Sequence, residues 1–153
     1  HIAHDCSVGN KVTMANGATL AGHCEIGDSV TIGGLTAVLQ FSRVGNNAFL
    51  AGMSAISGDV IPYGMAQGNL AKLRGLNVVG MRRRRFTHQR LQLVREFYQK
   101  LFHSPGIFAE RLAAIRPMAS ADPAIAEILA FIDAGDKRPL CMAYNKSDRL
   151  QVE

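Results

Sequence analysis

From Ile2 to Ile61, an aliphatic residue recurs at every sixth position, usually followed directly by a very small residue and, four positions on, by a small or β-branched one. A fixed short period of this kind is typical of a parallel β-helix, in which each hexad supplies one short strand and one corner. The aliphatic residue points inward, and the small residues allow the backbone to turn. The inward set is Ile2, Val8, Met14, Leu20, Ile26, Ile32, Val38, Val44, Leu50 and Ile56.

Three hexads make one triangular coil, and successive coils stack at the spacing of neighbouring β-strands, about 4.8 Å. Residues that are eighteen positions apart therefore lie above one another. His4 lies below Gly22 in one such column, and Asp5 lies below His23 in the next. The complete columns are His4, Gly22, Gln40 and Gly58, and Asp5, His23, Phe41 and Asp59.

The repeat stops at Pro62, and after a connecting segment rich in Gly and Asn the spacing of apolar residues becomes helical. One helix is predicted over residues 87–103, where an apolar stripe ends at a Ser-Pro-Gly breaker, and a second over 107–115. A third begins at Asp122 with Pro123 in its first turn and stops at Gly135. Residues 137–153 show no clear period.

The expected fold class is therefore a β-solenoid followed by α-helices. We predict a hexapeptide-repeat β-helix over residues 1–64, a connecting segment over 65–80 and a small C-terminal helical domain over 81–153. A prism of about three turns is only marginally stable by itself, because each repeat buries its core only against its neighbours. We therefore expect it to associate with other copies.

Length and composition fit one domain or two small ones, with an ample core, since 48% of the 153 residues are hydrophobic. No apolar run reaches membrane-spanning length and no charged leader precedes an apolar stretch, so we expect a cytoplasmic protein without a membrane span. The three cysteines agree with a reducing cytoplasm, because Cys6 and Cys24 are expected to stack as small hydrophobes and Cys141 has no partner in view. The chain begins at His1 in phase with the repeat, which indicates missing earlier coils.

Two histidines and a carboxylate, His1, His4 and Asp5, lie close together at the start of the first coil. An imidazole can act as a base near neutral pH, and an adjacent carboxylate orients the ring and stabilises its protonated form. Gly22, directly above His4, leaves its backbone N–H open to a developing oxyanion. Surface histidines also occur as solvated residues or between subunits, and a glycine also fits a tight corner, so the spacing leaves both interpretations open.

The strongest charge feature is the run Arg82–Arg85, in a chain with a formal net charge of +5. No aromatic residues are interleaved with it and no nucleic-acid-binding motif accompanies it, so we expect no nucleic-acid partner. A plain solvated basic face remains open for Arg82 and Arg85.

Beyond the generic hexad, several stretches resemble the UDP-N-acetylglucosamine O-acyltransferase family, which opens lipid A biosynthesis in Gram-negative bacteria. They are residues 1–6, 15–23, 32–41 and 66–69, and the resemblance continues through Gly75-Leu76-Asn77 and the arginine run into the helices. It implies a left-handed β-helix, a homotrimer and no cofactor or metal. It also implies transfer of a 3-hydroxyacyl chain from acyl carrier protein to the 3-hydroxyl of UDP-N-acetylglucosamine, without an acyl-enzyme.

The resemblance also implies roles for individual residues. His4 matches the catalytic base, Asp5 matches the residue that orients it, and the N–H of Gly22 matches the oxyanion donor. The matching substrate-binding positions are His1, His23 and Gln40 in the sugar and acyl pocket, Asn77 at the uridine, and Arg83 and Arg84 at the phosphates. Lys72, Arg74 and the other arginines are expected to attract the acidic acyl carrier protein.

Two further positions bear on specificity. Gly52, which shares a column with Asn16 and Gly34, matches the acyl-length ruler of the family, so we expect an open groove and a long acyl chain. Leu39 stands where the family often has a histidine, which removes one polar contact to substrate. An amino-sugar analogue of UDP-N-acetylglucosamine therefore stays open as the acceptor.

Three other functions remain open at this stage. The N-acyltransferase of lipid A synthesis also uses a histidine base, although residues 32–41 and 66–69 resemble the O-acyltransferase more. A γ-type carbonic anhydrase stacks histidines on a β-helix but needs three zinc ligands, and His4 and His23 have no convincing third ligand. The third alternative is a scaffold without catalytic activity.

Overall fold

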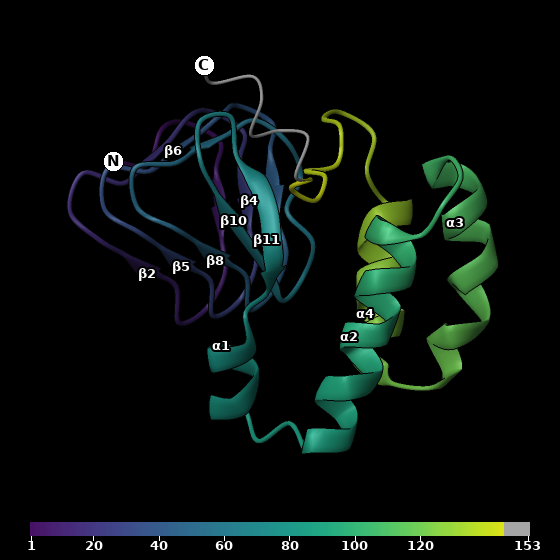
Figure 1. Cartoon of the computed structure of the whole chain (residues 1–153). Coiled ribbons are helices and arrows are strands. Elements are labelled where there is room, and N and C mark those ends of the chain that lie inside the picture. Colours follow the sequence, from purple (N-terminus) through teal and green to yellow (C-terminus); the bar gives the residue numbers. More distant parts are fainter. Residues whose placement is uncertain (146–153) are drawn as a thin grey trace.

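The computed structural model describes residues 1–145, which form three coils of parallel β-helix, a β-hairpin and a group of helices beside them (Figure 1). Each hexad contributes one two-residue strand. The strands are β1 (Ser7–Val8), β2 (Thr13–Met14), β3 (Thr19–Leu20), β4 (Glu25–Ile26), β5 (Thr31–Ile32), β6 (Ala37–Val38), β7 (Arg43–Val44), β8 (Phe49–Leu50) and β9 (Ala55–Ile56).

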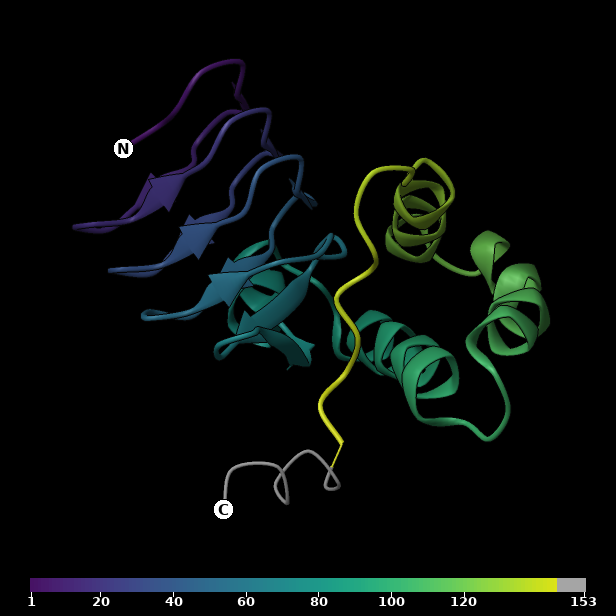
Figure 2. The same cartoon turned by 90° about the horizontal axis from the view of Figure 1, so that it is seen from above.

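These strands form the three faces of a prism, and Figure 2 shows it from the side, with the N-terminal coil at the top and the later coils following below it. The first face has the order β1-β4-β7, the second β3-β6-β9, and the third contains β2-β5-β8. Pairing is parallel at a spacing of eighteen residues, as in Ser7 with Glu25 and Thr13 with Thr31. The columns predicted from the six-residue period are therefore confirmed as far as Gln40 and Phe41. Their last members, Gly58 and Asp59, are not stacked on them, because Asp59 pairs with Leu140 and Val60 pairs with Val44 at a spacing of sixteen.

The repeat produces this shape because of what each position buries and how each corner turns. Leu20, Ile32 and Leu50 are fully buried inside the prism. The second residue of each corner adopts a left-handed backbone conformation, with φ 58° at Asp5 and 60° at His23. Such a conformation costs a residue other than glycine about 1 kcal/mol. The stacked hydrogen bonds and the buried aliphatic core offset this cost.

The regular spacing ends between β9 and Val60, just before Pro62, and a hairpin then extends the third face. Val44 pairs with Val60, sixteen positions later, in place of eighteen. Strand β10 (Gly64–Gln67) lies parallel to β8, and β11 (Lys72–Leu76) lies antiparallel to β10. Most of the predicted connecting segment is thus β-structure packed on the solenoid. The division into three domains stays a prediction.

Five helical segments follow, and the three that we predicted are confirmed. Thr87 caps the second by accepting from the Arg90 N–H, and Asp122 caps the last by accepting from the Ala124 N–H. A short helix over the arginine run was not predicted, although its cap, Asn77 accepting from the Gly80 N–H, is a start signal in the sequence. The segments are α1 (Val78–Arg83), α2 (His88–His103), α3 (Phe108–Ile115), the 3-10 helix η1 (Arg116–Ser120) and α4 (Pro123–Asp133).

The helices attach to the solenoid through the shared apolar core and through Arg43, whose guanidinium donates to the Phe131 carbonyl on α4 at 2.8 Å. The Arg43 guanidinium on β7 lies 2.9 Å from the Asp59 carboxylate and 4.1 Å from the centre of the Phe131 ring on α4. No helix within residues 1–145 is long and apolar enough to span a membrane.

Residues 137–143, here named the C-terminal strap, return from α4 to the end of the β-helix, between the solenoid and α2 (Figure 2). The Asp59 N–H donates to the Pro139 carbonyl at 2.9 Å, and the Cys141 N–H donates back to Asp59 at 2.8 Å. This segment shows no period in the sequence, because its backbone pairs with residues that are far away along the chain. Residues 146–153, the end of the predicted helical domain, lie outside the described residues.

All three cysteines are free, as the sequence predicts. Burial raises the pKa of Cys24 and of Cys141 to about 11, so neither thiol forms a nucleophilic thiolate at neutral pH. Cys6 is half-buried, and its Sγ donates to the Ala21 carbonyl at 3.1 Å.

Candidate active site

The imidazole of His4 lies against the backbone of Gly22 on the coil above. A Cβ atom built on Gly22 would stand 2.6 Å from Cε1 and 2.8 Å from Nε2 of His4. Only glycine leaves room for the ring in this place. The vertical relation of a base to a backbone amide, expected from the spacing, is therefore present in the structure.

Asp5 holds the other side of the His4 ring. Its Oδ2 lies 2.9 Å from His4 Nδ1, and 3.8 Å from His23 Nε2. The hydrogen bond to His4, with the charge of His23, lowers the pKa of the Asp5 carboxyl below its usual value. An ionised carboxylate only accepts hydrogen bonds, so in the neutral imidazole of His4 it favours the tautomer with the proton on Nδ1 and a lone pair on Nε2. This tautomer suits a general base.

The Gly22 N–H lies next to His4 and is not used by the backbone ladder. Within residues 1–145 it donates to no acceptor, although the Gly22 carbonyl accepts from Phe41 N at 3.1 Å. A free backbone donor beside a base is the arrangement that stabilises an oxyanion in acyl transfer. The side chains of His4 and Asp5 are 73% and 66% exposed, so a substrate can reach both.

His23 contacts this pair, and Gln40 and His1 lie further along the same part of the prism. The His23 ring meets the His4 ring edge-on, with centroids 5.1 Å apart, and Gln40 lies on the next coil up, in the column of Gly22. His1 lies on the strand that leads to the His4 corner, where its carbonyl accepts from Leu20 N at 2.9 Å. These predicted positions are thus close to His4 in the fold.

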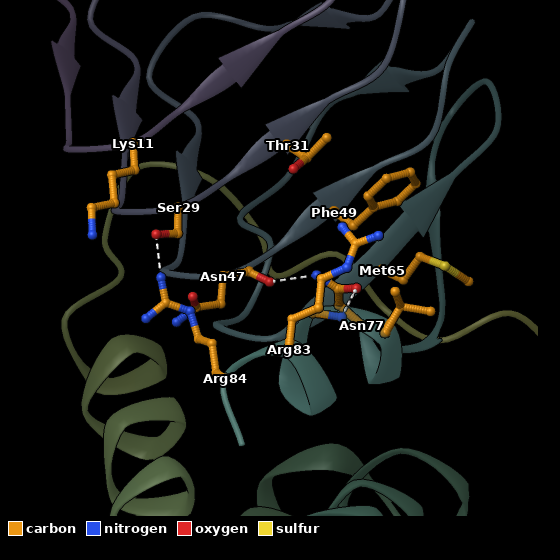
Figure 3. Close-up of a pocket in the computed structure, with 11 residues that line it drawn as sticks. Lys11, Ser29, Thr31, Asn47, Phe49, Met65, Asn77, Arg83 and Arg84 are labelled. Atoms are coloured by element: carbon orange, nitrogen blue, oxygen red, sulfur yellow. Dashed lines mark hydrogen bonds between the residues drawn. The ribbon is translucent and has the colours of Figure 1, made fainter. Parts of the chain in front are cut away.

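Asn77, Arg83 and Arg84 line a different site, a pocket of about 630 Å³ between α1 and the third face (Figure 3). Asn77 Nδ2 donates to the Asn47 carbonyl at 2.9 Å, and the Arg84 guanidinium donates to Ser29 Oγ. Sequence reasoning missed several lining residues. The missed residues are Lys11, Ser29, Asn47, Thr31, Phe49, Met65 and Val79. Three of them, Lys11, Ser29 and Asn47, form a column at a spacing of eighteen, which is the sequence signal that could have found them.

One chain does not bring all the predicted site residues together. His4, Gly22 and Gln40 occupy the corner between the first and second faces, whereas the Arg83 pocket lies on the third face. Gly52 occupies a third corner, above Gly34, next to the 77% exposed side chain of Met53. Within one chain, His4, Asp5 and the Gly22 amide thus form one group. Arg83 and Arg84 form another.

His4, Asp5 and His23 are also the group, within residues 1–145, that could hold a metal ion. Their ligand atoms all lie within 4.8 Å of one another. Asp5 is the third potential ligand that the sequence spacing did not suggest. All three side chains are exposed, and the Asp5 carboxylate already accepts from His4.

The model of a known family, described as UDP-N-acetylglucosamine O-acyltransferase, domain 2, matches residues 59–141, which is more than half of the chain. The chain belongs to the UDP-N-acetylglucosamine O-acyltransferase family. The matched region contains the hairpin, the helices, and most of the C-terminal strap.

Relatives named acyl-(acyl-carrier-protein)–UDP-N-acetylglucosamine O-acyltransferase align over nearly the whole chain. The protein from Caulobacter vibrioides is 56% identical over 142 residues, which are 93% of this chain and 54% of the relative. That from Thermodesulfovibrio yellowstonii is 49% identical over 141 residues, 92% of this chain and 54% of the relative. The chain thus spans about half the length of the curated relatives it matches.

Solved structures of UDP-N-acetylglucosamine acyltransferases have the same fold. The Campylobacter jejuni structure gives a TM-score of 0.84 at 38% identity, covering 95% of this chain and 56% of that one. The Arabidopsis structure gives 0.85 at 36% identity, covering 91% and 51%. The expected fold class of the UDP-N-acetylglucosamine O-acyltransferase family, a left-handed parallel β-helix followed by helices, is confirmed.

Proposed function

We propose that this chain carries the catalytic centre of an acyltransferase that moves a 3-hydroxyacyl chain from acyl carrier protein to the 3-hydroxyl of UDP-N-acetylglucosamine. This is the first step of lipid A biosynthesis, and we place it in the cytoplasm. The observation that carries the proposal is the His4 imidazole, oriented by Asp5 at 2.9 Å and lying against the free amide of Gly22. The names of the relatives support the choice of substrates.

The reaction proceeds by direct attack. His4 Nε2 takes the proton of the sugar hydroxyl while that oxygen attacks the thioester carbonyl carbon. The Gly22 N–H donates to the oxyanion of the tetrahedral intermediate. When the intermediate collapses, the C–S bond breaks, and the imidazolium of His4 returns the proton to the leaving thiolate. Asp5 stabilises the imidazolium during this exchange.

The pocket beside α1 suits the nucleotide part of the acceptor. Arg83 and Arg84 present guanidinium groups, whose planar fork matches phosphate oxygens. Asn77 supplies amide groups, and Phe49 and Met65 supply apolar surface. We therefore assign the diphosphate to the arginines and the uridine to the Asn77 side of the pocket.

A second copy of the chain would join the two groups of residues. The His4 corner and the Arg83 pocket lie on different parts of one prism. In a threefold assembly, the corner of one copy can lie against the third face of its neighbour, so that each complete site takes residues from two chains. We propose a homotrimer on this ground. Basic residues near the helices, Lys72 and Arg74 among them, would attract the acidic carrier protein.

Acyl transfer from a 3-hydroxyacyl carrier protein to UDP-N-acetylglucosamine tests the proposal, with the Caulobacter protein as the positive control for the reagents. His4→Ala should lower kcat by at least about a hundredfold, the usual contribution of a general base. The control is Lys100→Ala, since Lys100 pairs only with Glu96 on α2. Full transfer by His4→Ala would contradict the proposal, and an amide product would indicate the N-acyltransferase.

A further inference from the structure

The His4 corner continues upward as a stack of rings that ends on the C-terminal strap. The His23 ring lies face to face with Phe41 on the next coil, with centroids 4.7 Å apart and planes inclined by 9°. Beyond Phe41, Nζ of Lys137 stands 5.4 Å from the ring centre. Four side chains therefore form a row in which each lies next to the following one: His4, His23, Phe41 and Lys137.

The strap is fixed to the same corner by its backbone and by Arg138. Nε of Arg138 donates to the carbonyl of Gln40 at 2.8 Å. The Pro139 carbonyl approaches Gly58 so closely that a Cβ atom there would stand 2.6 Å from it. Asp59 pairs with Leu140 in the parallel sense, so beside Gly58 and Asp59 the strap takes the place that a further coil would occupy.

This stack restricts a side chain that would otherwise move. The His23 side chain is 42% exposed, and an imidazole with that much solvent around it can adopt several rotamers. The Phe41 ring lies flat on one face of the imidazole and leaves it fewer rotamers. Offset or parallel aromatic contacts of this kind are favourable. His23 in turn touches the His4 ring and lies 3.8 Å from the Asp5 carboxylate.

We propose that Phe41, held by the C-terminal strap, is a positioning residue that fixes the His23 ring and, through it, the His4–Asp5 pair. Phe41 itself touches no reacting atom. The kinetic part of this proposal rests on the proposed function, whereas the ordering of His23 does not.

Phe41→Leu tests the kinetic part, because leucine keeps apolar volume but has no ring face. We expect kcat to fall about tenfold, as displacement of a positioned group does, while KM changes less than about threefold. Phe41→Tyr keeps the face and should restore most of the loss. The matched control is Phe108→Leu on α3, where the ring lies 6.1 Å from Phe102 and away from the corner.

The ordering of His23 has its own measurement. In the NMR spectrum of the wild-type protein, the ring hydrogens of His23 should lie upfield of those of the exposed His88, because Phe41 shields them. Phe41→Leu should remove the shift and Phe41→Tyr should keep it. Arg138→Met removes the hydrogen bond that anchors the strap to Gln40. It should reduce both the upfield shift of the His23 ring hydrogens and kcat.

Several outcomes would overturn the proposal. They are an unshifted His23 signal in the wild-type protein, a kcat of Phe41→Leu within twofold of the wild type, and an equal fall in Phe108→Leu or in Phe41→Tyr. If the wild type transfers no acyl chain, the proposed function fails, and the NMR shift still decides whether Phe41 orders His23.

Discussion

The position of His4 depends on one missing carbon atom. At Gly22 the hydrogen in place of a side chain lets the imidazole lie over the amide, and the eighteen-residue period was enough to predict that the two would meet. The same period predicted that Asp5 would lie below His23, but not that the Asp5 carboxylate would approach Nε2 of His23 to 3.8 Å, because this contact depends on how the two side chains turn from their corners. Columns follow from the repeat, whereas rotamers follow from packing.

Gly22→Ala should separate the two groups without unfolding the protein. The added methyl would stand 2.6 Å from the His4 ring, which must swing aside into solvent. We expect kcat to fall about a hundredfold, because the base leaves its place beside the oxyanion donor. The free energy of unfolding should change by less than about 1 kcal/mol, because the side chain that must move, His4, is 73% exposed although Gly22 itself is buried. Urea denaturation and steady-state kinetics measure both quantities, and unchanged kcat would contradict the assigned roles.

Gly52→Met should shorten the preferred acyl chain. The backbone of Gly52 is not in the left-handed region, and a Cβ atom would stand 3.2 Å from the Gly34 carbonyl, so a side chain fits with a small adjustment. Each methylene excluded from the groove loses about 0.8 kcal/mol, about fourfold in kcat/KM. A competition assay with acyl chains of different lengths measures the preference. Gly52→Ala should show a smaller shift, and an unchanged preference with methionine would reject the role of Gly52.

At the scale of the element, sequence reasoning succeeded where a local signal exists. The helices α2 and α4 were predicted from apolar spacing and from caps at Thr87 and Asp122. The hairpin β10–β11 and the strap were not, because their short strands bury residues against partners far away in the sequence. The arginine pocket was predicted only through resemblance, since its shape comes from α1 lying over the third face.

Asp122 joins two helices, and its removal should weaken both. It caps α4 and lies 2.7 Å from Arg90 Nε on α2. We expect Asp122→Ala to lower the free energy of unfolding at pH 7 by about 2–3 kcal/mol, from a lost cap and a half-exposed partner left unpaired. Asp122→Asn, which can still cap the helix, should lose only the part due to the ion pair.

The pH dependence of this loss has a definite sign. The hydrogen bond from Arg90 lowers the pKa of the Asp122 carboxyl below 3.8. The stabilisation by the ion pair is therefore complete well above pH 3.8 and disappears as the pH falls through the lower folded-state pKa. Urea denaturation of the wild type and Asp122→Asn should give curves that converge in acid. A difference that persists unchanged at pH 2 would show that the ion pair is not its cause.

At the scale of the whole molecule, the distribution of the site residues is the main result. The base group and the arginine group occupy different faces, and no rearrangement of a single rigid prism joins them. The resemblance predicted a homotrimer, and the separation gives that prediction a physical reason. The sequence alone could not supply this reason, because the hexad period does not say which corner faces which neighbour.

Co-expression of two inactive variants tests the shared site. His4→Ala lacks the base and Arg83→Ala with Arg84→Ala lacks the arginines, so each homotrimer should be inactive. In random mixed trimers about a quarter of the sites receive both intact halves, and a corresponding part of the wild-type activity should return. Light scattering should give about three times the 16.5 kDa mass of the chain. Trimers without any recovered activity would contradict a site shared between copies.

The coil length also limits how a protein of this kind can evolve. Inserting one residue between positions 4 and 22 would rotate every later corner relative to the base, so the chain tolerates changes of length only in multiples of a full turn. Even a clean loss of residues 22–39 would set Gln40, with its side chain, directly over His4. Divergence at this centre is therefore open to substitution and closed to most insertions and deletions.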